Sequence, residues 1–241
     1  MNSEFRNLMS ELVIALQVIT EKIAPITSHF VHFQSTTTVI ANFIPSLEQQ
    51  SWFISLSIPM DYYPKLAAAA HEGSEVKLTT VIESIYRQEI GNMGAELSTL
   101  FPKRASQISP GCDAHARQEY ALSVPMFLIA AAGICYDALQ TDLFKQGHFR
   151  KKLKEILKQR HEKEKWRTEY EIALFGIFDK TIRFARTTSS NDISSHYEVN
   201  RHAVLHGTAL PEHYGSELNS LKAFSFLATV ASVLHFVASD A

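Results

Sequence analysis

The segment of this chain best suited to chemistry is 200–207, which reads Asn-Arg-His-Ala-Val-Leu-His-Gly. It places one guanidinium, on Arg201, close in sequence to two imidazoles, on His202 and His206. RNA is cleaved when its own 2′-hydroxyl attacks the neighbouring phosphate, which requires a proton acceptor, a proton donor and a cation beside the developing charge. Histidine, with an unperturbed pKa of ~6.5, serves in either proton transfer. Arginine keeps its charge and holds phosphate oxygens with a planar fork. These residue types therefore fit RNA cleavage without a metal or other cofactor.

A purely structural interpretation of the same segment stays open. Arg201 can pair with Glu198 or Glu217, and His206, near a helix end, can interact with the last carbonyl groups. On a helix, Arg201 and His206 are separated by about 140° in azimuth, because one turn takes about 3.6 residues. They do not share a narrow stripe, so the arginine has to bend round to act together with the histidine.

A metal site is the third interpretation. His202 and His206 stand four residues apart, a known spacing of zinc ligands, and His196 and His213 are near in sequence. A third ligand is not evident, however, and Ala203 stands where an HExxH motif has its glutamate. We expect no metal and no cofactor here.

Residues 200–207 resemble the signature of HEPN ribonucleases, in which Arg and a polar residue are followed by three to five further residues and then His. Arg201, His202 and His206 fill those positions. The likeness extends to Phe101-Pro102-x-Arg104 and to residues 119–125, 133–135 and 217–223, so it covers about 101–238. It implies an all-α, HEPN-like helical bundle and a metal-independent endoribonuclease that acts as a toxin or phage-defence effector.

The resemblance also implies roles for individual residues. Arg201 would stabilise the phosphorane and His206 would transfer protons, while His202 or Asn200 would orient them. HEPN proteins pair the motif with its copy in a second subunit, so a homodimer with one shared groove is expected. Partners implied are RNA and a cognate antitoxin or defence-system protein.

One departure from the family concerns the helix before the motif. A polar residue is expected before Gly133, but alanines occupy 130–132. Asp137, one turn later, is the candidate substitute. If it does not serve, the alternative is a non-catalytic HEPN module that dimerises and binds nucleotide, RNA or a protein partner.

A basic stretch precedes the motif. Residues 145–167 contain ten Lys or Arg and three Glu, a charge distribution typical of an RNA-binding surface. The candidate RNA contacts are Lys151, Lys152, Lys154 and Lys158. A solvated helix face is the simpler interpretation of the same charges. Tyr214, just after the motif, either lines the cleft or packs within a loop.

Composition limits the remaining possibilities. The formal net charge is −2, so any nucleic-acid site has to come from local charge rather than from the whole chain. The two cysteines are too few for a disulfide framework and are expected to be reduced thiols. No secretory signal or long uncharged apolar run is evident, so a cytoplasmic location without membrane contact is expected.

Helical spacing of apolar residues dominates the chain. We expect an N-terminal helical region of unknown role over 1–100, including a helix capped by Ser74, and a HEPN-like bundle over 101–241. The connector at the boundary between these two regions is expected to contain 101–104 and 109–111. Helices are expected over about 113–143, with a kink at Pro125, and then over 149–185, 197–207 and 216–238. Gly207 fits a C-terminal cap of the third of these.

Overall fold

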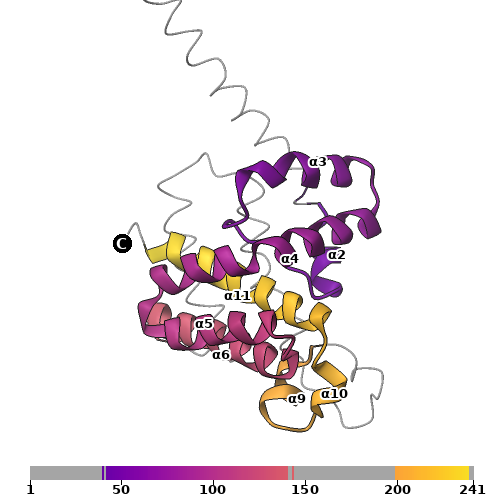
Figure 1. The fold of residues 1–241 in the computed structure, drawn as a ribbon. Helices are drawn as coiled ribbons and strands as arrows, with labels where there is room; N and C mark the ends of the chain where they lie inside the picture. The colour runs from indigo at the N-terminus through magenta and orange to yellow at the C-terminus, as the bar shows by residue number, and fades with distance from the viewer. Residues whose placement is uncertain (1–39, 41, 141–142, 144–198, 239–241) are drawn as a thin grey trace, which may run out of the picture.

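The computed structural model describes residues 40, 42–140, 143 and 199–238 (Figure 1). The secondary structure of these residues is helical, without a strand, which confirms the predicted all-α class. The helices in chain order are α2 (Ile44–Gln49), η1 (Met60–Tyr62), α3 (Tyr63–His71), α4 (Glu75–Leu100), η2 (Pro102–Arg104), α5 (Ala105–Ala116), α6 (Tyr120–Leu139), α9 (Arg201–Leu205), α10 (Pro211–Tyr214) and α11 (Glu217–Ala238).

Helix α4 begins where its sequence predicts. The Ser74 hydroxyl oxygen accepts a hydrogen bond from the Lys77 backbone N–H at 3.4 Å and so caps the helix. A Cβ at Gly94 would overlap the sulfur of Cys112, so this glycine allows α4 and α5 to approach closely. Burial raises the pKa of the Cys112 thiol to about 12, and both cysteines are free thiols.

The predicted single helix over 113–143 is wrong, because the chain turns between α5 and α6. Gln118 adopts a left-handed conformation, with φ of 62°. The Gln118 N–H donates to the His115 carbonyl at 2.9 Å, and the Glu119 N–H donates to the Ala114 carbonyl at 2.8 Å. These two bonds form a Schellman cap that closes α5. Since a glutamine rather than a glycine occupies the left-handed position, the sequence carries no strong signal for this stop.

The predicted connector at 109–111 is also wrong, because these residues lie inside α5. Pro110 removes one backbone donor from the helix, yet Ile108, Gly111 and Ala114 are buried. A Cβ at Gly111 would lie 2.8 Å from a ring carbon of Phe127, so α5 and α6 meet closely at this glycine. Tertiary packing thus maintains a helix that the local signals oppose.

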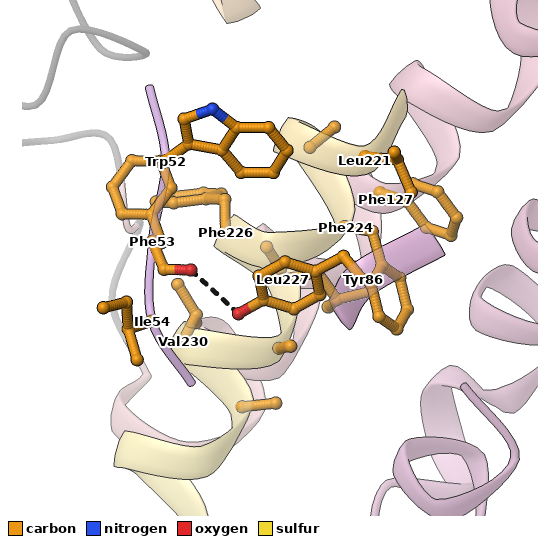
Figure 2. Close-up of a cluster of buried hydrophobic side chains, with 14 of the residues drawn as sticks. Trp52, Phe53, Ile54, Tyr86, Phe127, Leu221, Phe224, Phe226, Leu227 and Val230 are labelled. Atoms are coloured by element: carbon orange, nitrogen blue, oxygen red, sulfur yellow. Dashed lines mark hydrogen bonds between the residues drawn. The ribbon is translucent and has the colours of Figure 1, made fainter. Parts of the chain in front are cut away.

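Helix α11 forms the centre of the core and matches the predicted 216–238 closely. It packs against α6 and α4, and its residues Leu227, Val230 and Leu234 are buried. Figure 2 shows the aromatic side chains around it. Phe53 meets Phe226 with ring centroids 5.1 Å apart, and Phe127 meets Phe224 at 5.2 Å, both edge to face.

The core also contains a buried tyrosine hydroxyl with satisfied hydrogen bonds. The Tyr86 hydroxyl donates to the Phe53 carbonyl at 2.8 Å (Figure 2) and accepts from the Ser55 backbone N–H at 3.1 Å. Burial raises the pKa of Tyr86 above its ordinary value. Because Phe53 and Tyr86 precede residue 100 and pack against α11, residues on both sides of the expected 100/101 boundary share one core.

Helix α6 has the length and apolar composition of a helix that could cross a membrane, and half of its most apolar stretch is buried in the fold. It packs against α5 and α11. It also contacts α9 and α10, the two short helices that carry the candidate motif and the turn after it.

Candidate functional site

The motif helix α9 starts at an asparagine cap. Asn200 has an extended backbone, and its side-chain oxygen accepts a hydrogen bond from the Ala203 N–H at 3.1 Å. The residue is only 8% exposed, and its side-chain carboxamide caps the first turn of the motif helix. Helix α9 spans Arg201–Leu205, shorter than the predicted 197–207, and residues 197 and 198 lie outside the described part of the chain.

The other end of α9 is closed by the glycine that its sequence predicts as a cap. Gly207 has φ of 70°. Its N–H donates to the Val204 carbonyl at 3.3 Å, and the Thr208 N–H donates to the Ala203 carbonyl at 2.9 Å. This pair of bonds is a Schellman motif, so the predicted role of Gly207 is confirmed. The five-residue helix is therefore capped at both ends.

The caps fix which side chains α9 presents. Ala203 and Val204 are buried, whereas His206 is exposed and Arg201 and His202 are partly exposed. The rings of His202 and His206 lie beside each other, with centroids 4.3 Å apart and planes tilted by 50°. The structure thus brings the two predicted imidazoles together at the surface, with Arg201 at the first position of the same helix.

Tyr214 has a packing role. It is 8% exposed, and its hydroxyl donates to the Ala121 carbonyl at 3.3 Å. The Asn219 side-chain amide donates to the Tyr214 carbonyl at 3.1 Å, and the Asn219 N–H donates to the Ser216 hydroxyl oxygen at 3.2 Å. These bonds join α10 to the first turns of α6 and α11. The described contacts of Tyr214 are thus packing contacts between α10 and the N-terminal end of α6.

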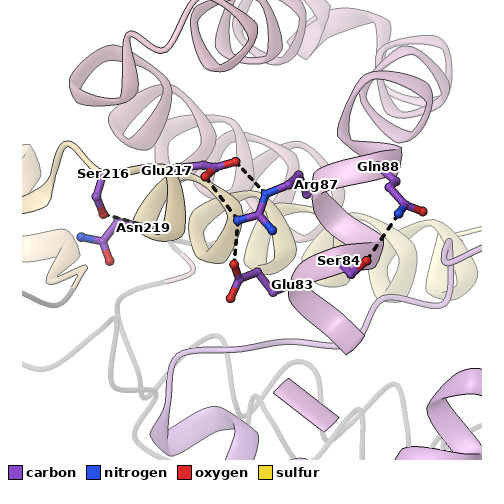
Figure 3. Close-up of polar contacts among 7 residues, drawn as sticks. All are labelled: Glu83, Ser84, Arg87, Gln88, Ser216, Glu217 and Asn219. Atoms are coloured by element: carbon purple, nitrogen blue, oxygen red, sulfur yellow. Dashed lines mark hydrogen bonds and ion pairs between the residues drawn. The ribbon is translucent and has the colours of Figure 1, made fainter. Parts of the chain in front are cut away.

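Glu217, an alternative partner considered for Arg201, binds Arg87 (Figure 3). The Arg87 Nε donates to one Glu217 oxygen at 2.8 Å and its Nη2 to the other at 3.2 Å. Nη2 also donates to Glu83 at 2.6 Å. Arg87 lowers the pKa of the Glu217 carboxyl. Both oxygens of Glu217 are thus used to join α4 to the N-terminal turn of α11.

A buried chain of polar groups joins α5, α6 and α11. His115 Nδ1 and the Ser220 hydroxyl share a hydrogen bond of 2.8 Å, and Ser220 shares one of 2.6 Å with the Ser123 hydroxyl. Burial lowers the pKa of His115. Its ring also meets the Tyr120 ring at 5.4 Å between centroids. Spacing along the sequence does not predict this chain of polar groups, although serines within apolar helices are the signal that could have indicated it.

Asp137, the candidate support for the motif, is bound by Arg104. The Arg104 Nε and Nη2 each donate to a different Asp137 oxygen at 2.8 Å. Asp137 lies 16 residues after Ala121, or about 24 Å along α6 at about 1.5 Å per residue. Ala121 is where Tyr214 contacts the helix. Both carboxylate oxygens therefore have a partner far along α6 from the contact with α10.

The remaining candidates differ in how they are placed. Lys151, Lys152, Lys154 and Lys158 lie outside the described residues. Over 40, 42–140, 143 and 199–238, no group of three or more His, Cys, Asp or Glu side chains is arranged to hold a metal ion. His213, a neighbour considered in the metal interpretation, is partly buried on α10.

Comparison with known proteins adds no identification. No protein-family model, curated protein or solved structure matches the chain.

Proposed function

We propose that this chain is a metal-independent endoribonuclease of the HEPN type, which cleaves RNA through its 2′-hydroxyl. The observation that carries the proposal is the arrangement on α9. Two imidazoles lie with ring centroids 4.3 Å apart, one of them is exposed, and an arginine occupies the first position of the same capped helix. This set supplies two proton-transfer groups and a permanent cation at the surface.

In the proposed reaction the 2′-oxygen attacks the adjacent phosphorus atom and the bond to the 5′-oxygen breaks. His206, the exposed imidazole, exchanges protons with the reacting oxygens, and His202 orients it from its neighbouring position. Arg201 stabilises the negative charge on the phosphorane. Asn200 contributes by capping α9 and so fixing the backbone from which these side chains project. The first product ends in a 2′,3′-cyclic phosphate.

A homodimer forms part of the proposal, because one Arg201 and His206 set in each chain is a sparse site alone. The basic stretch 145–167 supplies RNA contacts through Lys151, Lys152, Lys154 and Lys158. An RNA-degrading activity of this kind is toxic to the cell, so a cognate antitoxin or a defence-system protein is the partner that restrains or triggers it.

The alternative is a non-catalytic module that dimerises and binds nucleotide, RNA or a protein partner. One observation favours it. Alanines occupy 130–132, and both carboxylate oxygens of Asp137 accept hydrogen bonds from Arg104. The α6 carboxylate considered as a substitute for the expected polar residue thus has another partner.

Incubation of the purified full chain with end-labelled RNA and excess chelator separates the two functions. The nuclease gives fragments with cyclic or 3′-phosphate ends, and leaves the same sequence intact when the 2′-hydroxyls are replaced by hydrogen. Binding of RNA without cleavage supports the module. Cleavage that requires a divalent ion contradicts the proposed mechanism.

A further inference from the structure

The two imidazoles of the motif are held one helical turn apart by the backbone of α9. The His206 N–H donates to the His202 carbonyl at 3.0 Å, which is the hydrogen bond between residues four apart that closes an α-helical turn. The ring centroids lie 4.3 Å apart, and the planes are tilted by 50°. His202 is partly exposed and His206 is exposed. The capped helix therefore places both rings side by side at a surface that dissolved ions reach.

Two neighbouring imidazoles form a chelate when one nitrogen of each binds the same metal ion. Zn²⁺ binds imidazole nitrogen at about 2.0–2.1 Å, so two such nitrogens on one tetrahedral ion lie about 3.3 Å apart. Rings with centroids 4.3 Å apart reach this geometry by small rotations about their side-chain torsions, which exposed side chains make readily. The backbone of α9 does not have to move for His202 and His206 to share an ion.

The other coordination positions of such an ion stay open. Within the part of the chain that the structure describes, no third His, Cys, Asp or Glu joins the pair in a metal-binding group. Imidazole ligands favour Zn²⁺ and Cu²⁺ over Mg²⁺ and Ca²⁺, which prefer oxygen ligands. The positive charge of Arg201 on the same helix opposes a cation, so binding is weaker than in a closed site with four ligands. The arrangement therefore fits an ion that binds reversibly.

We propose that His202 and His206 together bind one divalent transition-metal ion, Zn²⁺ or Cu²⁺, and that this ion inhibits the cleavage of RNA. The inhibition rests on the proposed ribonuclease function, whereas the binding depends only on the two rings. A neutral imidazole accepts a proton through the same nitrogen lone pair that it gives to a metal. Coordination therefore removes the proton acceptor from His206 and holds His202 on the ion. Withdrawal of the ion restores both side chains.

Calorimetric titration of the full chain with Zn²⁺ alone tests the binding. The chain contains 11 histidines, so the assignment depends on matched variants. His202→Gln and His206→Gln should each lower the affinity by about tenfold or more, because each removes one of the two ligands. His71→Gln on α3 and His213→Gln on α10 are the controls and should keep the affinity of the parent chain. Circular dichroism checks that each variant keeps its helices.

Electron paramagnetic resonance of one equivalent of Cu²⁺ identifies the ligands directly, because each coordinated imidazole nitrogen splits the signal. We expect two imidazole nitrogens in the parent chain and one in His202→Gln or His206→Gln. A single imidazole in the parent chain overturns the proposal, as does equal Zn²⁺ affinity in the parent and in both motif variants. A loss of affinity in either control as large as in the motif variants overturns it too.

RNA cleavage in a Zn²⁺ series tests the inhibition. Half-inhibition is expected at the Kd found by calorimetry, with recovery when chelator is added, and Mg²⁺ at the same concentrations should have no effect. Cleavage that Zn²⁺ leaves unchanged or stimulates overturns the inhibition. Because the calorimetry uses no RNA, a chain that binds Zn²⁺ at these residues but cuts no RNA contradicts the proposed function alone. A chain that cuts RNA but binds no ion there contradicts the metal site alone.

Discussion

The guanidinium of Arg104 binds the carboxylate of Asp137 with two hydrogen bonds, each 2.8 Å long, from Nε and Nη2. The side chains are 23% and 30% exposed. Arg104 lowers the pKa of the Asp137 carboxyl, and Asp137 raises the pKa of the guanidinium. Gly133 makes room for the pair, since a Cβ there would lie 2.6 Å from the central guanidinium carbon. The ion pair therefore joins η2 to the last turns of α6.

We predict a stabilising coupling between these two residues. Arg104→Ala and Asp137→Ala should each lower the free energy of unfolding, and a double-mutant cycle in urea should give a coupling of about 1 kcal/mol. Gly133→Ala should destabilise the parent chain but cost less in the Arg104→Ala background, where its methyl group meets no guanidinium. Strictly additive changes would contradict the contact.

Gly207→Ala tests the cap of the motif helix. Because Gly207 has φ of 70°, an alanine there is strained, and we expect a loss of about 1–2 kcal/mol. Gly91→Ala is the matched control: Gly91 lies inside α4 without a positive φ or a neighbour that a Cβ would meet. That change should stabilise by up to about 1 kcal/mol. Thermal and urea unfolding measure both, and equal effects would contradict the cap.

The buried histidine should make stability depend on pH. Burial lowers the pKa of His115 in the folded chain, with a smaller opposing effect of Glu217 and a smaller additional lowering by Arg87. Between about pH 6.5, the ordinary histidine pKa, and the lower folded pKa, the unfolded chain binds more protons. The contribution of His115 to the free energy of unfolding is therefore fully present above about pH 6.5, and it decreases as the pH falls through this window.

Urea unfolding as a function of pH measures this slope. His115→Gln should remove it over that window, while His71→Gln, on the exposed last turn of α3, should leave it in place. The carboxyl groups with lowered pKa values, Glu217 and Asp137, lose their contribution only at more acidic pH, below about 4.5. A slope unchanged by His115→Gln would contradict the assignment.

The catalytic prediction concerns Arg201 and His206. Arg201→Ala and His206→Ala should each abolish detectable RNA cleavage, since one proton-transfer group is worth about 10²–10⁴ in rate. His213→Ala, a nearby histidine on α10, is the control and should retain activity. Light scattering should report a dimer for the parent and for all three variants. Persistent cleavage by His206→Ala, or an active monomer, would show that the mechanism is wrong.

The salt dependence of RNA binding tests the basic stretch. Changing Lys151, Lys152, Lys154 and Lys158 to Gln should weaken binding and reduce the log–log salt slope by about 0.7–0.9 for each lost phosphate contact. Lys65→Gln with Lys77→Gln, on the exposed surfaces of α3 and α4, is the control for a general change of charge. Fluorescence anisotropy in a salt series gives both slopes. Equal slopes in the parent and the quadruple variant would mean a merely solvated surface.

The sequence predicts those elements whose boundaries have local chemical signals. Ser74 and Gly207 mark helix ends because a hydroxyl cap and a left-handed glycine act within a few residues. Gln118 stops α5 without such a signal, since glutamine rarely adopts positive φ. Pro110 indicates a stop that does not occur, because the helix is maintained by side chains packed on α4 and α6, the α-helices that precede and follow it, and such packing leaves no signal at the proline itself.

In the candidate site, too, the sequence predicts the local relationships but not the contacts between residues far apart in the chain. The segment 200–207 predicts a short capped helix that presents two imidazoles, because those relationships are local. The partner of Asp137 is 33 residues away, and Ser220 is 105 residues from His115. Pairs of this kind depend on which helices meet and in which register, which spacing along one chain does not specify.

The double capping of α9 has a consequence for recognition at the motif. The Ala203 N–H is already bound by Asn200, and the Ala203 and Val204 carbonyls are bound by the turn at Gly207. These main-chain groups are thus already hydrogen-bonded before any ligand arrives. The side chains of α9 therefore determine which ligand the motif selects. Exchange of one imidazole or the guanidinium can therefore alter what the motif recognises while its scaffold persists unchanged.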